Sequence, residues 1–296
     1  MKKSTPATSC LLFSFIALVL AAAEPDYVRN IEKWRADRET NLKKESGWLS
    51  VAGLSWLKEG TNTVGAGDKF DVRLTENFKA GKFGQIDFEN GKAVLKVESG
   101  VEARSDGNSI TGPVELVSDE KGKPTEIRTG TQTFFLIKRE ERYGIRVKDS
   151  NSEARRNFAG LHWFPVNEAF KVTARLEPGT EEKEVKVPNV LGGFFKMKSP
   201  GRLKFTLDGK EQSLQAVEED DGSLFLIFGD QSNEKETYKS GRFLYADKAV
   251  NGETVLDFNK AENPPCAFTP YATCPLPPAG NRLAITINAG EKRFDH

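Results

Sequence analysis

Hydrophobic and polar residues follow two different periods along this chain. From Tyr27 to Leu42 apolar residues recur among charges at helical spacing, and Pro25 suits a first helical turn. After Gly47 the period changes to two, which is typical of half-buried strands. The alternating apolar positions are Phe70, Val72 and Leu74; Ala93, Leu95 and Val97; Ile145 and Val147; Val172, Ala174 and Leu176; Leu203, Phe205 and Leu207; and Leu283, Ile285 and Ile287. The pattern predicts one N-terminal amphipathic helix followed by strands.

Turn signals separate the predicted strands. Asx-Gly pairs, which supply the positive φ that tight hairpins need, occur at Asn90–Gly91, Asp208–Gly209, Asp221–Gly222 and Asn251–Gly252. Leu224–Phe228 is apolar throughout, as in a central strand that is covered on both faces. Strands joined by short hairpins, with little helix between them, predict a mainly β protein, an antiparallel β-sandwich or a partly open barrel.

The chain gives little sign of a division into domains. The polar turn at 119–124 is the best candidate for an internal boundary. Neither half has a linker long or biased enough to separate it from the other. We therefore predict a single domain over residues 24–296.

The first residues resemble a secretory signal peptide. Lys2 and Lys3 precede an apolar run over Leu11–Leu20, and Ala21–Ala23 forms a small-residue cleavage site. The apolar run is about half the roughly 20 residues that a membrane-spanning helix needs. We expect cleavage after Ala23, a secreted or periplasmic protein, and no transmembrane segment.

Composition and charge narrow the class of partner. The chain has 43 basic and 43 acidic residues, and removing residues 1–23 takes away two lysines and no acid. A protein that binds nucleic acid normally carries a basic excess, and no dense Lys/Arg block occurs here. We therefore exclude nucleic acid and anionic membrane surfaces as expected partners.

Polar residues and prolines are concentrated between Leu256 and Lys292. The motifs LDFN, NPPC, ATCPLPP, NRL and AGEK follow one another in this span. Prolines hold the backbone in fixed shapes, so polar groups beside them can be presented at low entropic cost. We interpret the span as a preformed polar pocket.

Several motifs together indicate a family. GWLSVAGLSWL at 47–57, TYKSGRFL at 237–244 and the C-terminal motifs occur in the order typical of domain-of-unknown-function family number 1684, which the chain resembles from about Trp34 to Lys292. The resemblance implies no established activity, fold or ligand. Glu262 departs from the family pattern, which has an aromatic residue before Asn263, and Ser232–Glu234 replaces a shorter turn. If Glu262 lines the pocket, we expect its ligand to differ.

Two cysteines remain after signal-peptide cleavage, Cys266 and Cys274. An even pair in an oxidising compartment favours a disulfide. A zinc site would need two further ligands, and a catalytic thiol would need an activating base. His162 is the single internal histidine besides the C-terminal His296, and its neighbours favour a structural role.

The remaining candidates for chemistry in the predicted pocket are carboxylates and cationic side chains. Arg242 would stabilise negative charge, because arginine binds carboxylates and phosphates bidentately, and Asp257 or Glu291 would act as acid or base. The binding residues expected beside these three are Asn259, Asn263, Lys292, Arg146 and Tyr238.

Two functions fit this group of residues. The favoured one is a cofactor-independent, hydrolase-like enzyme that acts on an anionic small molecule. The alternative is a non-catalytic module that binds a ligand or a cell-envelope fragment in the same pocket. No nucleotide-binding glycine pattern, Walker loop or metal motif occurs, so we expect no cofactor.

Overall fold

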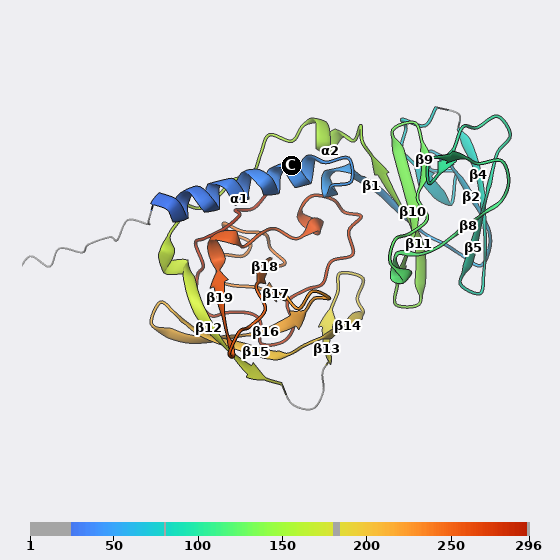
Figure 1. Ribbon diagram of the computed structural model, residues 1–296. Coiled ribbons are helices and arrows are strands. Elements are labelled where there is room, and N and C mark those ends of the chain that lie inside the picture. Colours follow the sequence, from blue (N-terminus) through green and yellow to red (C-terminus); the bar gives the residue numbers. More distant parts are fainter. Residues whose placement is uncertain (1–24, 80, 180–183, 295–296) are drawn as a thin grey trace, which may run out of the picture.

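The computed structural model describes residues 25–79, 81–179 and 184–294, which form two β-rich lobes (Figure 1). The first lobe contains residues 47–150 and the second lobe residues 151–294. The protein is mainly β, with 43% strand and 14% helix, as the alternating pattern predicts. The predicted signal peptide, residues 1–23, lies outside the described residues.

The predicted N-terminal helix is confirmed as α1 (Pro25–Lys43). Its buried residues, Ile31, Arg35 and Leu42, lie on one stripe, because they are spaced by four and seven residues. Leu42 packs in a small apolar cluster with Leu49 and Phe268, which joins the end of the helix to both lobes. Figure 1 shows α1 lying along the second lobe. No helix in the described part of the chain is apolar over a length that would cross a membrane.

The first lobe is a sandwich of two sheets. One sheet has the strand order β1-β11-β10-β9-β6-β7 and the other has the order β3-β2-β4-β5-β8. The strands are β1 (Val51–Trp56), β2 (Gly60–Ala66), β3 (Val72–Leu74), β4 (Lys82–Glu89), β5 (Lys92–Val97), β6 (Arg104–Ser105), β7 (Asn108–Ser109), β8 (Val114–Leu116), β9 (Ile127–Thr129), β10 (Gln132–Arg139) and β11 (Arg142–Asp149).

Residues from both sheets share one core in the first lobe. Ile86 and Leu95 from one sheet pack in the same cluster as Phe134 and Ile145 from the other. The pairs are antiparallel except β2 with β3, which run parallel among the described strands. The turn at 119–124 contains the 3-10 helix η2 (Asp119–Lys121) and lies between β8 and β9, within the first lobe. The single-domain prediction itself stays a prediction.

The second lobe contains a six-stranded sheet with the order β18-β17-β16-β15-β12-β19. Its edge strands β18 and β19 contact each other, so the sheet is nearly closed into a barrel. The strands are β12 (Lys171–Pro178), β15 (Gly201–Leu207), β16 (Lys210–Glu218), β17 (Leu224–Phe228), β18 (Arg242–Ala246) and β19 (Glu253–Asp257), with a separate hairpin of β13 (Glu184–Pro188) and β14 (Phe194–Lys198).

Five short helices lie elsewhere in the described chain, before β1, between β11 and β12, and after β19. They are α2 (Glu153–Arg156), η1 (Trp48–Ser50), η3 (Glu168–Phe170), η4 (Phe258–Lys260) and η5 (Pro265–Ala267).

The central strand follows the sequence prediction, and so do three of the four Asx-Gly turns; the exception is Asp221–Gly222, where Asp221 does not have a positive φ. Every residue of β17 is buried, because the strand lies between β16 and β18 with both faces covered. Asn90 and Gly91 have φ values of 49° and 81°, and Asp208 and Gly209 have φ values of 53° and 67°. Both pairs close the hairpins between successive antiparallel strands.

The predicted C-terminal strand is wrong in one respect. Leu283, Ile285 and Ile287 are buried at alternate positions in the second core, but they form no regular strand. The segment runs beside Gly229 with a single parallel bridge, and the backbone N–H of Ile287 donates to the Asp230 carboxylate at 3.1 Å. Backbone hydrogen bonds do join the segment to residues 229–231, from the Leu283 N–H to the Gly229 carbonyl at 2.7 Å and from the Gln231 N–H to the Ile285 carbonyl at 2.9 Å. At Ile287 the Asp230 side chain takes the place of a backbone acceptor, so the pairing does not continue as a regular strand.

Candidate functional site

A cavity of about 350 Å³ lies between the two lobes. Helix α1 and η1 contribute to its wall, together with β10 and β11 from the first lobe and β14, β17 and β18 from the second. Its lining residues combine cations with apolar and aromatic side chains. They are Arg38, Trp48, Arg139, Arg146, Phe195, Met197, Phe225, Phe243, Tyr245, Glu262, Pro265, Thr273, Cys274 and Pro275.

Strand alternation places Arg146 in this wall. Ile145 and Val147 belong to the core of the first lobe, so Arg146 between them projects from the opposite face of β11, toward the second lobe. Its guanidinium carbon lies 5.5 Å from the centroid of the Trp48 ring, within the range of a cation-π contact.

The charge of Arg146 has no counter-ion among the residues that the structure describes. The residue is 5% exposed, and among the described residues no carboxylate lies within ion-pair distance of it. Both of its hydrogen bonds come from Nη2, to Thr273 Oγ1 at 3.3 Å and to the Tyr271 carbonyl at 3.5 Å. Nε is buried without a partner in the described part of the chain. Burial, and then the charge of Arg139, lowers the pKa of Arg146 to about 10.

Arg139 completes the basic end of the cavity. Its guanidinium pairs with Asp119 at 2.8 Å, so this charge is balanced. Its Nε donates to Thr273 Oγ1 at 3.0 Å, and Arg146 donates to the same oxygen. Thr273 therefore accepts hydrogen bonds from two arginines, and only Arg139 is paired with a carboxylate. The group formed by Arg139, Arg146, Thr273 and Asp119 carries one excess positive charge.

Arg38 sits between two buried carboxylates at another part of the wall. Its Nε lies 2.9 Å from Glu291 and 3.3 Å from Glu262. Glu291 is fully buried and also accepts the backbone N–H of Asn263 at 2.8 Å, whereas Glu262 lines the cavity. Burial raises the pKa of Glu262 to about 7, Glu291 adds to this rise, and Arg38 opposes it. One cation shared by two carboxylates leaves this cluster with an excess of negative charge.

Aromatic rings form the apolar side of the cavity. Phe225 packs edge-on against Phe243 with centroids 4.8 Å apart, and it stacks on Tyr245 at 4.9 Å. Phe195 and Met197 face the cavity from β14. A few convergent charges within an apolar wall are typical of small-molecule sites.

The two cysteines are free thiols in this structure, and Cys274 lines the cavity. The Cys266 backbone N–H donates to Cys274 Sγ at 3.1 Å. A hydrogen bond between the thiols lowers the pKa of Cys266 and raises that of Cys274. The predicted disulfide is not formed here and stays a prediction. In the described part of the chain, no group of three or more His, Cys, Asp and Glu residues could hold a metal ion.

The residues predicted for catalysis lie in three separate networks. Arg242 is fully buried, pairs with Asp230 at 2.8 Å, and donates to the carbonyls of Ile287 and Ala289. It therefore anchors the C-terminal segment to β18. Arg242 is not among the described residues that line the cavity.

Asp257 and Asn259 are close together because Asp257 caps the start of η4. The Asp257 carboxylate accepts the Asn259 backbone N–H at 3.1 Å and the Tyr27 hydroxyl at 2.8 Å. The Asn259 side chain bonds both the carbonyl and the N–H of Asn167. These bonds join the start of α1 to η4, away from the cavity lining.

The third network contains Glu291 and Asn263 around Arg38, next to the cavity. The Asn263 amide donates to the Lys292 carbonyl at 2.8 Å, while Lys292 Nζ lies near Glu236 on the surface. Tyr238 donates to the Cys266 carbonyl at 3.1 Å. Of the eight catalytic and binding predictions, Arg146 is the one that lines the cavity; the assigned roles stay predictions.

The sequence interpretation missed Arg38, Arg139, Thr273 and Tyr245. A signal for Arg38 was present, since Ile31, Arg35, Arg38 and Leu42 share one stripe of α1, and a charge within an apolar stripe marks a polar partner. Glu262 had been noticed as a departure from the family pattern. For Arg139 and Thr273 no local pattern pointed to the cavity.

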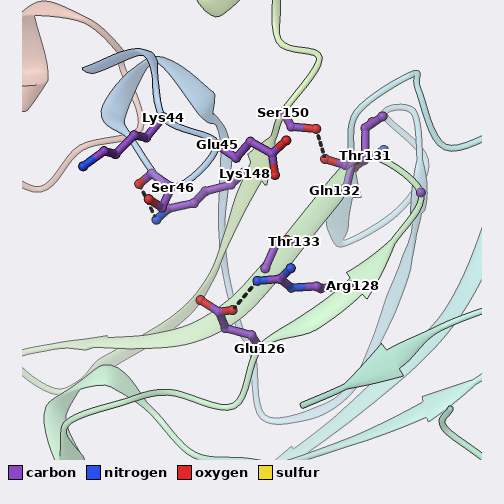
Figure 2. A pocket seen from close by; sticks show the side chains of 11 residues that line it. Lys44, Glu45, Ser46, Glu126, Arg128, Thr131, Gln132, Thr133, Lys148 and Ser150 are labelled. Carbon is purple, nitrogen blue, oxygen red and sulfur yellow. Dashed lines mark hydrogen bonds and ion pairs between the residues drawn. The ribbon is translucent and has the colours of Figure 1, made fainter. Parts of the chain in front are cut away.

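A second depression, of about 340 Å³, lies on the first lobe beside the end of α1 (Figure 2). Two of the cations that line it have protein partners (Figure 2): Arg128 pairs with Glu126 at 3.3 Å, and Lys148 donates to the Ser46 carbonyl at 2.9 Å. None of its three lining cations, Lys44, Arg128 and Lys148, is buried as Arg146 is, so this depression holds no buried charge for a ligand to compensate.

Fold and site together define a two-lobed β protein with a charged cavity between its lobes. Residues 156–292 match the model of the family described as "Protein of unknown function (DUF1684)", so this region of the chain is similar to that family. The matched region spans nearly all of the second lobe.

One similar solved structure is the solution NMR structure of the uncharacterized protein from gene locus rrnAC0354 of Haloarcula marismortui. It is 29% identical, the match covers 47% of this chain and 78% of that chain, and the TM-score is 0.40. The comparison with curated proteins gave no match.

Proposed function

We propose that the cavity between the lobes binds an amphiphilic anion, a small molecule with a carboxylate or phosphate head and an apolar body. The head would lie against Arg146 and Thr273, and the body along Phe195, Met197 and Phe225. If the predicted signal peptide directs export, the proposed binding would take place outside the cytoplasm.

The uncompensated charge of Arg146 carries this proposal. Burying a charge without a partner costs several kcal/mol, so such groups are normally paired. A ligand anion would supply the missing counter-charge at Nη1, which makes no hydrogen bond to the described residues. Arginine presents its donors in a planar fork that suits carboxylate and phosphate oxygens.

Calorimetric titration with hexanoate, octanoate and phenyl phosphate tests the proposal. A charge-assisted hydrogen bond contributes about 1.5 to 3 kcal/mol, so Arg146→Gln should weaken binding roughly tenfold to a hundredfold. Arg128→Gln is the matched control, because Arg128 lies in the other depression and is paired with Glu126. Equal affinity in the wild type and in Arg146→Gln would refute the proposal.

A catalytic role for the same cavity is favoured by one observation. Glu262 lines the cavity, and burial raises the pKa of its carboxyl to about 7, the range that suits a general acid or base. Under this second proposal Glu262, rather than Asp257, would transfer the proton during hydrolysis of an anionic ester. The wild type should hydrolyse phenyl phosphate or a carboxylate ester, and Glu262→Gln should bind the same compound without hydrolysing it. If the wild type binds these compounds but hydrolyses neither, the catalytic proposal is wrong.

A further inference from the structure

The cavity carries charge of both signs, contributed by different lobes. Arg146 supplies one excess positive charge from the first lobe. On the second lobe Arg38 is shared by Glu262 and Glu291, which leaves an excess of negative charge when both carboxylates are ionised. In the described residues no ion pair joins Arg146 to Glu262, although both line the same cavity.

Glu262 is the carboxylate that a ligand can reach. Glu291 is fully buried and is held by Arg38 Nε at 2.9 Å and by the Asn263 N–H at 2.8 Å. Glu262 has the longer contact to Arg38, at 3.3 Å, and its side chain is 14% exposed. Its carboxylate therefore competes poorly for the shared guanidinium and has capacity for another partner.

The side chains next to Glu262 suit an organic cation. Phe243 pairs with Glu262 through an antiparallel bridge, so their side chains stand side by side, and Tyr245 follows on the same strand face. Aromatic faces attract ammonium groups, and a neighbouring carboxylate strengthens that attraction. A metal ion would instead need several oxygen ligands converging on one point.

We infer that the ligand is a zwitterion, with its anionic head on Arg146 and an ammonium group in the corner formed by Glu262, Phe243 and Tyr245. This rests on the proposed function, because it assigns the second end of a molecule whose first end Arg146 binds. The apolar side chains that line the same cavity favour a hydrocarbon spacer. The ligand class is therefore ω-amino acids and related amines that carry a distant carboxylate or phosphate.

Calorimetric titration with two matched series tests this inference. One series is butyrate, hexanoate and octanoate; the other is γ-aminobutyrate, ε-aminohexanoate and ω-aminooctanoate. We expect one member of the amino series to bind roughly tenfold tighter than its matched carboxylate. ε-Hydroxyhexanoate, which is polar and uncharged at that end, should show no such gain.

Variants separate this inference from the proposed function. Glu262→Gln should remove the gain from the amino group and leave carboxylate binding intact, whereas Arg146→Gln should weaken both series. Glu236→Gln is the control, a surface glutamate that is paired with Lys292 outside the cavity lining. If carboxylates bind through Arg146 but the amino group adds nothing at any length, or if the gain survives in Glu262→Gln, the zwitterion is refuted and the anion site stands. If neither series binds, or Arg146→Gln binds as well as wild type, both proposals fail.

Discussion

Replacing Arg146 with methionine should make the protein more stable while it weakens anion binding. Arg146 is 5% exposed, its guanidinium has no carboxylate partner among the described residues, and its pKa is lowered to about 10. That lowering corresponds to roughly 3 kcal/mol of lost interaction for the charged form. The loss of the hydrogen bonds to Thr273 and Tyr271 and the change in packing should offset about 1 to 2 kcal/mol of this gain in stability. The expected net gain is about 1 to 2 kcal/mol, or roughly 2 to 6 °C in Tm.

Thermal unfolding followed by circular dichroism measures this gain. Because the folded pKa of Arg146 lies near 10 and the unfolded value is higher, the side chain is charged in both states at all lower pH values. The gain should therefore be constant between about pH 5 and pH 8, and it should shrink only as the pH approaches the folded value. Arg128→Met is the control, since an exposed ion pair contributes at most about 1 kcal/mol. A Tm for Arg146→Met several degrees below that of the wild type would show that this arginine serves the fold.

The other predictions concern the carboxylate cluster and the thiols. The pKa of Glu262 is raised in the folded state from 4.5 to about 7, so the stability of the wild type should fall as the pH rises through that range. Glu262→Gln should therefore be more stable than the wild type at about pH 8, by up to roughly 3 kcal/mol. At about pH 4 the two proteins should be nearly equal in stability. Parallel pH profiles of Tm for the two proteins would contradict this. Arg38→Ala leaves the buried Glu291 unpaired and should lower the free energy of unfolding in urea by about 3 to 5 kcal/mol. The double variant Arg38→Ala/Glu291→Gln should regain most of that stability. If it does not, the unpaired charge is not the cause of the loss. Under oxidising conditions Cys266 and Cys274 should form a disulfide worth about 2 to 3 kcal/mol. Thiol titration of the unfolded, oxidised protein checks it, and two reactive thiols would refute it.

Local patterns predicted the elements of this fold well. Leu224–Phe228 could be recognised as a central strand because five consecutive apolar residues need cover on both faces. Asn90–Gly91 closes a hairpin because its backbone requires positive φ at both positions. The division into two lobes could not be predicted in this way, since it depends on which strands pair over long distances, and alternation alone does not specify partners.

The polar C-terminal motifs have a different role from the one their composition suggested. The 281–291 segment forms no regular strand, and polar side chains complete the hydrogen bonding of its backbone and of the backbone beside it. Asn281, for example, donates to the carbonyls of Gln215 and Ile227 at 3.0 Å and accepts the Gln215 N–H at 2.7 Å. Asn259 and Arg242 bond in the same manner. Local sequence cannot distinguish polar groups that serve the backbone from polar groups that serve a ligand, because both lie in proline-rich, irregular chain.

Arg146 illustrates the remaining difficulty. Its position between Ile145 and Val147 indicated a strand with a charge on the outer face, where solvent would be the ordinary neighbour. Burial came from the second lobe, through Thr273 and Tyr271, which lie more than a hundred residues away in the chain. The charge could be predicted from the sequence, but its burial depends on how the two lobes pack.

A crystal structure of the protein grown with octanoate tests the central claim most directly. The account predicts the carboxylate within hydrogen-bond distance of Arg146 and the hydrocarbon chain along Phe195, Met197 and Phe225. Octanoate bound elsewhere, in the depression of Figure 2 for example, with only water against Arg146, would contradict it.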